Sequence, residues 1–385
     1  MRNNKLIFLI VLLLALMLPG CANSKKSETK EKLNVFIDIK DNESIDLLNK
    51  LIEDYKGKNP KINLNTTSVL ENNTDVIFTT RTNMINFADK GYLKEMKDYI
   101  DENKIDERYY KIVKLYGRYN DKDYGIPIIL NPLEIYYNED SIKRNNLTIP
   151  VDKTGLLKLL QELRNKSIQV PVMIPEKTEE VLFAFIVNNT MDVTLLDKNF
   201  DLGIQNYNNI NEMKIPFDIL KDIIRKNILG KSSFIKSEEK TGGKMEKGEV
   251  PILISNNLVQ GSNIKVFQNY SKGIVPVSSK LVASIYAGSE NSKQGEDFIK
   301  YIFSDETQKI LNEEGCISGN KTVNNEKTGV EKDIFNQLGS MDEKSIAYFD
   351  TIPDKLKEAV QERIEIMLSG KFSENEWYET IKSAF

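Results

Sequence analysis

The chain has 385 residues, of which 53 are Lys or Arg and 57 are Asp or Glu, so its formal net charge is −4 at pH 7. The basic residues are scattered among acidic ones, which argues against the basic face that nucleic acid requires, and we expect no nucleic-acid partner. The sequence contains no histidine and two cysteines, which excludes catalytic Ser-His-Asp and Cys-His groups and zinc sites built on several His or Cys. We expect no metal, no cofactor and no enzymatic activity.

The N-terminus begins with Arg2 and Lys5, followed by an unbroken apolar run at 6–18 and then Pro19-Gly20-Cys21. The run is shorter than the roughly 20 apolar residues that span a membrane. Its charged start and small-residue end are typical of a cleavable secretory signal. The residues before Cys21 resemble a bacterial lipobox, which implies cleavage after Gly20 and a lipid on the Cys21 thiol. The alternative is an ordinary signal peptide in which the cysteine is accidental.

A diacyl lipid on Cys21 carries two acyl chains, enough for stable attachment to the outer face of a membrane. The following segment, 22–32, has almost no apolar side chain and is predicted to stay solvated and flexible. We therefore assign a signal peptide to 1–20 and a lipidated tether to 21–31. Lipidation leaves Cys316 as the remaining thiol, so no intramolecular disulfide is expected.

The folded part is predicted to begin with a strand, a helix and two more strands. Apolar residues alternate over 33–39 and then recur at helical spacing over 45–55, with Gly57 ending the helix. Shorter apolar segments follow at 62–64 and 76–78. Strand, helix and strand with short connections indicate a parallel α/β sheet.

Residues 231–247 are polar and are predicted to form a loop before a strand at 250–254. Within this loop, Thr241-Gly242-Gly243-Lys244 has a superficial likeness to a phosphate-binding loop. It lacks the preceding strand at the required spacing and a Ser or Thr after Lys244, so it indicates a turn instead.

The C-terminal part is predicted to be helical. Apolar spacing indicates a helix or helix pair over 298–311 and another helix over 356–368. Ser373 and Glu376 have the spacing of a capping box that starts the last helix, in which Trp377 is expected to be a core residue.

Four stretches carry recognisable motifs: a buried strand and a helix end at 74–78 and 87–93, a YGIP-to-LEIYYN segment at 124–138, a strand entry at 245–250, and a helical segment at 293–315. Together, and in this order, they resemble the extracellular solute-binding proteins of ABC importers, in the group that includes maltodextrin-binding protein. The resemblance covers most of the chain after the tether.

This resemblance implies an α/β, two-lobed periplasmic-binding-protein-like fold of type II, with a ligand cleft between lobes joined by crossing hinge segments. On that basis the first lobe comprises 32–130 and 285–330, and the second comprises 131–284 and 331–385. Ligand binding then shifts an equilibrium between open and closed lobes. The expected partners are a small solute, with sugar as the leading class, and the permease of an ABC transporter, and the protein is expected to be a monomer.

Loops at the carboxyl ends of strands face the cleft in an open α/β sheet. The family's cleft motifs then map to amide, hydroxyl and charged residues that suit hydrogen bonding to a polyol. The candidate ligand-binding residues are Lys40, Asp41, Asn42, Thr79, Thr80, Arg81, Thr82, Asn83, Leu130, Asn131, Ser255, Asn256, Asn257, Tyr348 and Phe349.

The sequence departs from the maltodextrin binders at several of these positions. Thr79 and Leu258 stand where those proteins have aromatic platforms for sugar rings, and Asn131 stands where they have a carboxylate. Only Tyr348 or Phe349 offers a ring. The adjacent Tyr136 and Tyr137 resemble a pair in ferric-ion binders, but they lie inside a strand motif, and a structural role is expected.

The leading hypothesis is a lipid-anchored extracytoplasmic protein that captures a sugar or oligosaccharide for an ABC transporter. One alternative is a degenerate family member that acts as a sensor or an adhesin. Another is a surface glycosidase, which requires two carboxyl groups about 5–9 Å apart. The nearest candidates for that pair are Asp41 and Glu134.

Overall fold

The structure is a computed structural model that describes residues 31–149, 153–168, 172–173, 178–200, 205–228, 241–267 and 274–384. Cys21, the predicted signal peptide and most of the predicted tether lie outside these ranges. Among the helices in these ranges, none combines the length and apolar character needed to cross a membrane.

The first lobe is built on a five-stranded sheet with the order β2-β1-β3-β13-β6. Strand β1 is parallel to β2 and β3, and β13 is antiparallel to both of its neighbours. The predicted strand-helix-strand unit is confirmed, although β1 starts at Glu31, before the apolar alternation. The elements of this unit and sheet are β1 (Glu31–Asp38), α2 (Asn42–Lys58), β2 (Ile62–Thr67), β3 (Val76–Thr79), β6 (Ile126–Pro127) and β13 (Val282–Ile285).

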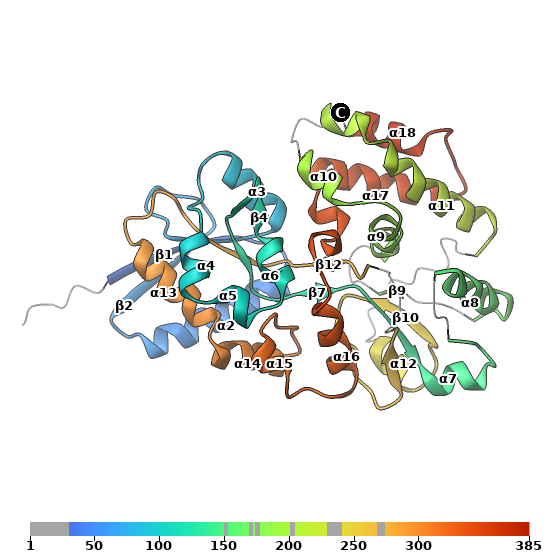
Figure 1. The fold of residues 1–385 in the computed structure, drawn as a ribbon, viewed down its shortest axis with the longest axis horizontal. Helices are drawn as coiled ribbons and strands as arrows, with labels where there is room; N and C mark the ends of the chain where they lie inside the picture. The colour runs from blue at the N-terminus through green and yellow to red at the C-terminus, as the bar shows by residue number, and fades with distance from the viewer. Residues whose placement is uncertain are drawn as a thin grey trace, which may run out of the picture.

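Seven further helices and a hairpin complete the described part of this lobe (Figure 1). The helix pair predicted over 298–311 is confirmed as α13 and α14. The elements are α3 (Arg81–Asp89), α4 (Lys97–Glu102), α5 (Ile105–Arg108), α6 (Lys111–Tyr116), α13 (Ser292–Ile302), α14 (Asp305–Glu313) and α15 (Lys321–Asn324), with the hairpin β4 (Arg118–Tyr119) and β5 (Lys122–Asp123).

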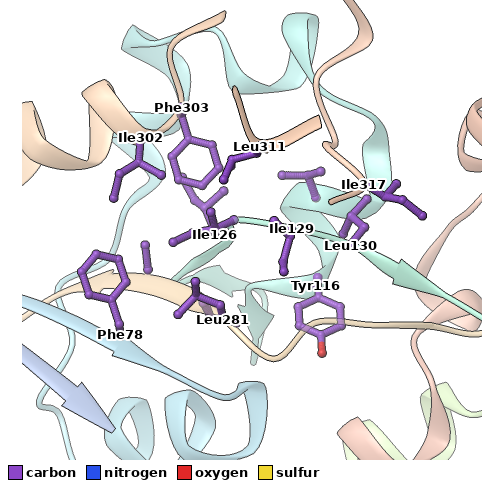
Figure 2. Close-up of a cluster of buried hydrophobic side chains, with 14 of the residues drawn as sticks. Phe78, Tyr116, Ile126, Ile129, Leu130, Leu281, Ile302, Phe303, Leu311 and Ile317 are labelled. Atoms are coloured by element: carbon purple, nitrogen blue, oxygen red, sulfur yellow. The ribbon is translucent and has the colours of Figure 1, made fainter. Parts of the chain in front are cut away.

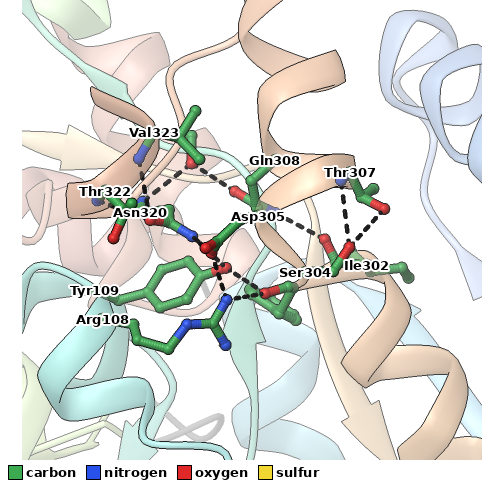
Figure 3. A network of polar contacts seen from close by, with 12 residues as sticks. Arg108, Tyr109, Ile302, Ser304, Asp305, Thr307, Gln308, Asn320, Thr322 and Val323 are labelled. Atoms are coloured by element: carbon green, nitrogen blue, oxygen red, sulfur yellow. Dashed lines mark hydrogen bonds and ion pairs between the residues drawn. The ribbon is translucent and has the colours of Figure 1, made fainter. Parts of the chain in front are cut away.

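A polar network fixes α14 and α15 against the end of α5 (Figure 3). Asp305 accepts from Arg108 Nη2 at 2.6 Å and from Asn320 Nδ2 at 2.7 Å. Ser304 caps α14 by accepting from the Thr307 amide, and Asn320 caps α15. Both helix starts are therefore set by side chains that satisfy otherwise unpaired amide groups.

The second lobe has a four-stranded sheet with the order β11-β8-β10-β9. Figure 1 shows its helices on the right of the molecule, with α17 and α18 close to α11. The elements are β8 (Glu134–Asn138), α7 (Glu139–Arg144), α8 (Lys153–Asn165), β9 (Val172–Met173), α9 (Thr178–Thr190), α10 (Thr194–Lys198), η1 (Gln205–Asn209), η2 (Asn211–Met213), α11 (Lys214–Arg225), α12 (Thr241–Glu246), β10 (Ile252–Ser255), β11 (Ile264–Val266), α16 (Gly329–Leu338), α17 (Asp354–Leu368) and α18 (Glu376–Ser383).

The lobes are joined where β7 (Asn131–Pro132) pairs antiparallel with β12 (Val277–Ser278). A third passage of the chain, which belongs to the second lobe, runs along this junction after η4 (Glu343–Ser345), where Ile346 forms a bridge with Val277 and leads into η5 (Tyr348–Asp350). These crossing segments lie at the centre of the view in Figure 1. The boundary predicted at 284/285 falls inside β13, because that strand of the first sheet already begins at Val282.

Buried apolar side chains form two clusters. The first surrounds Phe78 and Phe303 in the first lobe (Figure 2) and also takes in one face of the second sheet with Tyr136 and Leu253. The second contains Phe183 and Phe217. Successive residues of a strand point to opposite faces of its sheet. In β8 and β10, therefore, alternate residues join different clusters, so the second sheet is covered on both faces.

Two local predictions were wrong. Residues 241–246 form the helix α12 rather than a turn. The last helix is capped by Asn375, which accepts from the Tyr378 amide, rather than by Ser373. Glu376 does accept from the Ser373 amide at 2.7 Å, so one half of the predicted capping box is present. Trp377 is 2% exposed and donates to the Tyr207 carbonyl, which confirms its core role.

Two glycines offer a matched test of backbone packing. A Cβ on Gly117 would lie 1.7 Å from the Gly125 carbonyl oxygen, whereas a Cβ on Gly57 in α2 meets no atom within 4 Å. Gly117→Ala should therefore destabilise the protein by about 1–3 kcal/mol through overpacking. Gly57→Ala should stabilise it by about 0.5–1 kcal/mol, because glycine loses more chain entropy in a helix. Chemical denaturation measures both, and equal effects of the two substitutions would contradict the close approach.

Candidate functional site

The carboxyl ends of β1 and β3 lie next to each other and bring together the first two groups of predicted residues. Asp38, at the end of β1, accepts from Thr79 Oγ1 at 3.1 Å and from Asn83 Nδ2 at 2.8 Å. Thr80 caps α3 by accepting from the Asn83 amide. The sequence prediction did not include Asp38, although its place at the end of a strand is the signal that could have found it.

Asp41 caps the start of α2 and forms an ion pair with Lys280, two residues before β13. One carboxylate oxygen accepts from the Ser44 amide and hydroxyl, and the other lies 2.8 Å from Lys280 Nζ. Burial opposes ionisation of Asp41, but the bonds from Lys280 and Ser44 outweigh it and hold its pKa below the usual value. Its neighbours Lys40 and Asn42 are exposed.

Arg81 is fully buried and uses all five of its N–H donors. The guanidinium donates to both carboxylate oxygens of Asp197, at 2.7 and 3.1 Å. Its other bonds go to the carbonyl oxygens of Tyr116, Arg118 and Asp350. Burial alone would lower the pKa of Arg81, but Asp197 raises it, so the side chain stays charged. In this arrangement Arg81 has no donor left for a ligand.

Tyr116 and Asp350 lie beside this arginine, where the chain crosses between the lobes. The Tyr116 hydroxyl accepts from the Ser279 amide at 2.7 Å and donates to Asp350 Oδ2 at 2.7 Å. Burial raises the pKa of Asp350 to about 6, with Lys357, Tyr116 and Arg81 acting in the opposite direction. Sequence reasoning missed this pair because its members are 234 residues apart.

Asn131 and Asn256 each present a buried amide oxygen without a protein partner. For both residues, Oδ1 has no hydrogen-bond partner among the described residues. Asn131 lies in β7, and Asn256 follows β10, where Ser255 pairs with Glu134 of β8. Both amides therefore lie near the start of β8. Leu130, by contrast, is 1% exposed and bonds through its amide to the Ile317 carbonyl.

Other predicted residues are engaged by the protein itself. Ser255 is buried, and its hydroxyl accepts from the Asn257 amide. The Tyr136 hydroxyl donates to the Asn257 carbonyl, and Tyr137 packs against Phe267 with ring centroids 4.9 Å apart. These contacts support a structural role for the two tyrosines. Thr82 is 4% exposed.

The two candidate aromatic residues lie in η5. Tyr348 is fully buried with its ring edge-on to Phe183, at a centroid distance of 5.5 Å, and its hydroxyl lacks a partner among the described residues. Phe349 is 8% exposed, and Lys357 Nζ lies 4.8 Å from its ring centroid. Neither ring has a free face for a sugar to stack on in this arrangement.

Glu134 is buried near the start of the crossing region rather than exposed. Gln337 of α16 donates to one of its carboxyl oxygens at 3.2 Å, and the other oxygen has no partner in the part of the chain that the structure describes. Burial raises its pKa to about 8. Asp41 is paired with Lys280, and Glu134 is buried with one oxygen bonded to Gln337, so the two residues do not form an exposed pair of carboxyl groups.

A polar cavity of about 550 Å³ lies between the lobes beside Asp197. It is lined by α6 and the β4–β5 hairpin of the first lobe, by α10 of the second, and by residues 343–346 of the third passage. Over the described ranges, no group of three or more His, Cys, Asp or Glu side chains could hold a metal ion.

The comparisons with known proteins agree with this architecture. The family model for the bacterial extracellular solute-binding proteins matches residues 42–309, well over half of the chain.

The chain belongs to this family. Its members are extracellular binding proteins, which agrees with the predicted absence of enzymatic activity and indicates an extracytoplasmic location.

One curated relative is the multiple sugar-binding protein of Streptococcus mutans, which is 25% identical over 76% of each chain. Among solved structures, a chitin oligosaccharide binding protein matches 92% of this chain and 98% of its own, with a TM-score of 0.67 and 16% identity. The sugar-binding protein MalE from Xanthomonas citri matches 92% and 95%, with a TM-score of 0.66 and 12% identity. These likenesses confirm the two-lobed type II fold.

The buried carboxyl group of Glu134 predicts a specific pH dependence of stability. Its pKa rises from about 4.5 when exposed to about 8 in the fold, so ionisation favours the unfolded chain. The contribution of Glu134 to stability is therefore complete below about pH 4.5 and is lost as the pH rises to about 8. Glu134→Gln keeps the shape and an acceptor for Gln337, and it should stabilise the protein near pH 9 by a few kcal/mol.

Thermal unfolding measured near pH 4 and near pH 9 tests this dependence. The gain from Glu134→Gln should appear at the higher pH and vanish at the lower one. Glu358→Gln on the exposed side of α17 is the matched control and should show no such difference. Equal melting shifts at both values would contradict a raised pKa of Glu134.

Proposed function

We propose that this protein is a lipid-anchored binding protein that captures a sugar or oligosaccharide and delivers it to the permease of an ABC transporter. The observation that carries the sugar proposal is the pair of unpartnered amide oxygens of Asn131 and Asn256 at the junction of the lobes. A buried acceptor without a partner costs about 1–3 kcal/mol. Ligand hydroxyl groups are donors that can remove this cost.

Three further facts support the same proposal. The family is one of extracellular solute-binding proteins, and a curated relative binds sugars. The strand ends of the first lobe carry amide and charged groups at Asp38, Asn83 and Asp41. Directional groups of this kind orient small polar ligands in protein sites. Because the rings of Tyr348 and Phe349 are covered, we propose recognition mainly by hydrogen bonds.

We also propose two lobes with bounds close to those expected from the sequence. The first comprises 32–130 and 282–328, and the second comprises 131–281 and 329–385. The boundary moves from 284/285 to 281/282 because β13 begins at Val282 and pairs with β3 and β6 of the first sheet. The boundary moves from 330/331 to 328/329 because α16 begins at Gly329 and packs against β11 of the second sheet.

A binding screen tests the solute class. Calorimetry and thermal shift on the mature chain should detect at least one mono- or oligosaccharide, with a rise in melting temperature that follows the ligand concentration. Asn131→Ala and Asn256→Ala should each weaken binding about tenfold, because each removes one acceptor. Asn263→Ala removes an exposed amide that bonds Asp140 on the outer surface, and it should leave affinity unchanged. Binding of peptides or polyamines with no sugar response would contradict the carbohydrate proposal and leave a transport role standing.

Cell fractionation tests the anchor. The intact chain should enter the membrane fraction and incorporate labelled palmitate, because two acyl chains give stable attachment. Cys21→Ser should lose both the label and the membrane association while keeping solute affinity. Release of the unsubstituted protein into the medium would contradict lipidation at Cys21.

A further inference from the structure

A short segment of the second lobe, residues 194–200, reaches across to the first lobe. It contains α10 and ends at Phe200. Leu196 is fully buried in the second core, which fixes the segment to its own lobe. Asp197 and Phe200, in contrast, contact residues of the first lobe. Figure 1 shows α10 beside the boundary between the lobes.

The Asp197 contact is a two-bond ion pair with a fully buried partner. Arg81 belongs to α3 of the first lobe and is 0% exposed, whereas the Asp197 side chain is 27% exposed. Two parallel bonds to a carboxylate give both strength and a fixed orientation. The remaining donors of Arg81 are held by carbonyl oxygens of Tyr116, Arg118 and Asp350, so the guanidinium cannot follow Asp197 if α10 moves away.

The Phe200 contact is apolar and joins the same two parts of the molecule. Phe200 packs against the first core, and its ring lies edge-on to that of Tyr119, with centroids 6.4 Å apart and an interplanar angle of 75°. Tyr119 is in β4, directly after Arg118, whose carbonyl oxygen accepts from Arg81. The ion pair and the aromatic contact therefore hold segment 194–200 at two neighbouring points.

We infer that Arg81, Tyr119, Asp197 and Phe200 form an interlobe clasp that sets the angle between the two lobes. Loss of Asp197 would leave a buried guanidinium without its counter-charge, which is strongly unfavourable. Any change of lobe angle that separates α10 from α3 must break this pair. The clasp thus acts on the arrangement of the lobes and not on the fold of either one.

A neighbouring ion pair shows why we expect Arg81–Asp197 to be the stronger electrostatic contact between the lobes. Lys111 Nζ of the first lobe lies 3.8 Å from Glu343 Oε2 of the second beside the same cavity, but the two side chains are 66% and 51% exposed. Exposed pairs are screened by water and contribute little. Burial of Arg81 removes that screening.

Distance measurements between spin labels test the clasp without any solute. Labels placed on cysteines at the exposed positions Glu102 and Glu212, in a background of Cys21→Ser and Cys316→Ser, report one distance across the two lobes. The reference chain should give a single narrow distribution. Asp197→Asn should increase the population of other distances by about tenfold, and Phe200→Ala should act in the same direction with a smaller effect.

Asp121→Asn is the matched control. Asp121 lines the same cavity and pairs with Arg118 at 3.2 Å, but that pair lies within the β4–β5 hairpin and Asp121 is 96% exposed. It should leave the distribution unchanged. Amide hydrogen exchange in β3 and β10 checks that both lobes stay folded in each variant.

An unchanged distribution in both Asp197→Asn and Phe200→Ala would overturn the clasp, as would an equal effect of Asp121→Asn. If Asp197→Asn lost exchange protection in either sheet, the distance distribution of Phe200→Ala alone would test the clasp. That substitution leaves no buried charge unpaired. These outcomes do not depend on sugar binding, so failure of the clasp and failure of the proposed function can be distinguished.

Discussion

The pairing of β7 with β12, extended by the bridge between Val277 and Ile346, holds the two lobes together along adjacent passages of the chain. Because these passages are buried, their polar groups must find partners within the protein. Tyr116 satisfies the Ser279 amide and the Asp350 carboxylate at once. Side-chain hydrogen bonds therefore join these passages in addition to the backbone connections, although the Asn131 amide oxygen in β7 has no partner among the described residues.

Arg81 adds hydrogen bonds that reach from the junction into both lobes. A buried charge is tolerated only when a counter-charge and enough acceptors surround it. Here the counter-charge comes from α10 of the second lobe, and the acceptors come from α6, β4 and η5. The same bonds that satisfy the arginine make its environment depend on the relative position of the lobes.

Features that depend on nearby residues could be predicted from the sequence, and features that depend on distant partners could not. The strands and helix over 31–67 follow from apolar periodicity, and the overall architecture follows from motifs in order along the chain. Helix α12 was missed because a Gly-Gly pair and polar neighbours favour a turn. Among the candidate site residues, Thr79, Thr80 and Asn83 lie at the end of β3, where Thr79 and Asn83 both bond Asp38. Strand-end position could not show that Arg81 forms an ion pair with Asp197, because 116 residues separate the two.

The arrangement of the remaining polar groups constrains the kind of recognition that this junction can support. Thr79 is bonded to Asp38, and the ring of Tyr348 is covered by Phe183, so neither is free to bind a sugar ring by stacking or direct contact. The amide oxygens of Asn131 and Asn256 remain, and each accepts from donors in defined directions. A site that relies on such acceptors discriminates through the position of ligand hydroxyl groups, because a ligand that lacks one leaves a buried acceptor unpaired. Selectivity by stereochemistry is therefore expected to be stronger than selectivity by ligand size.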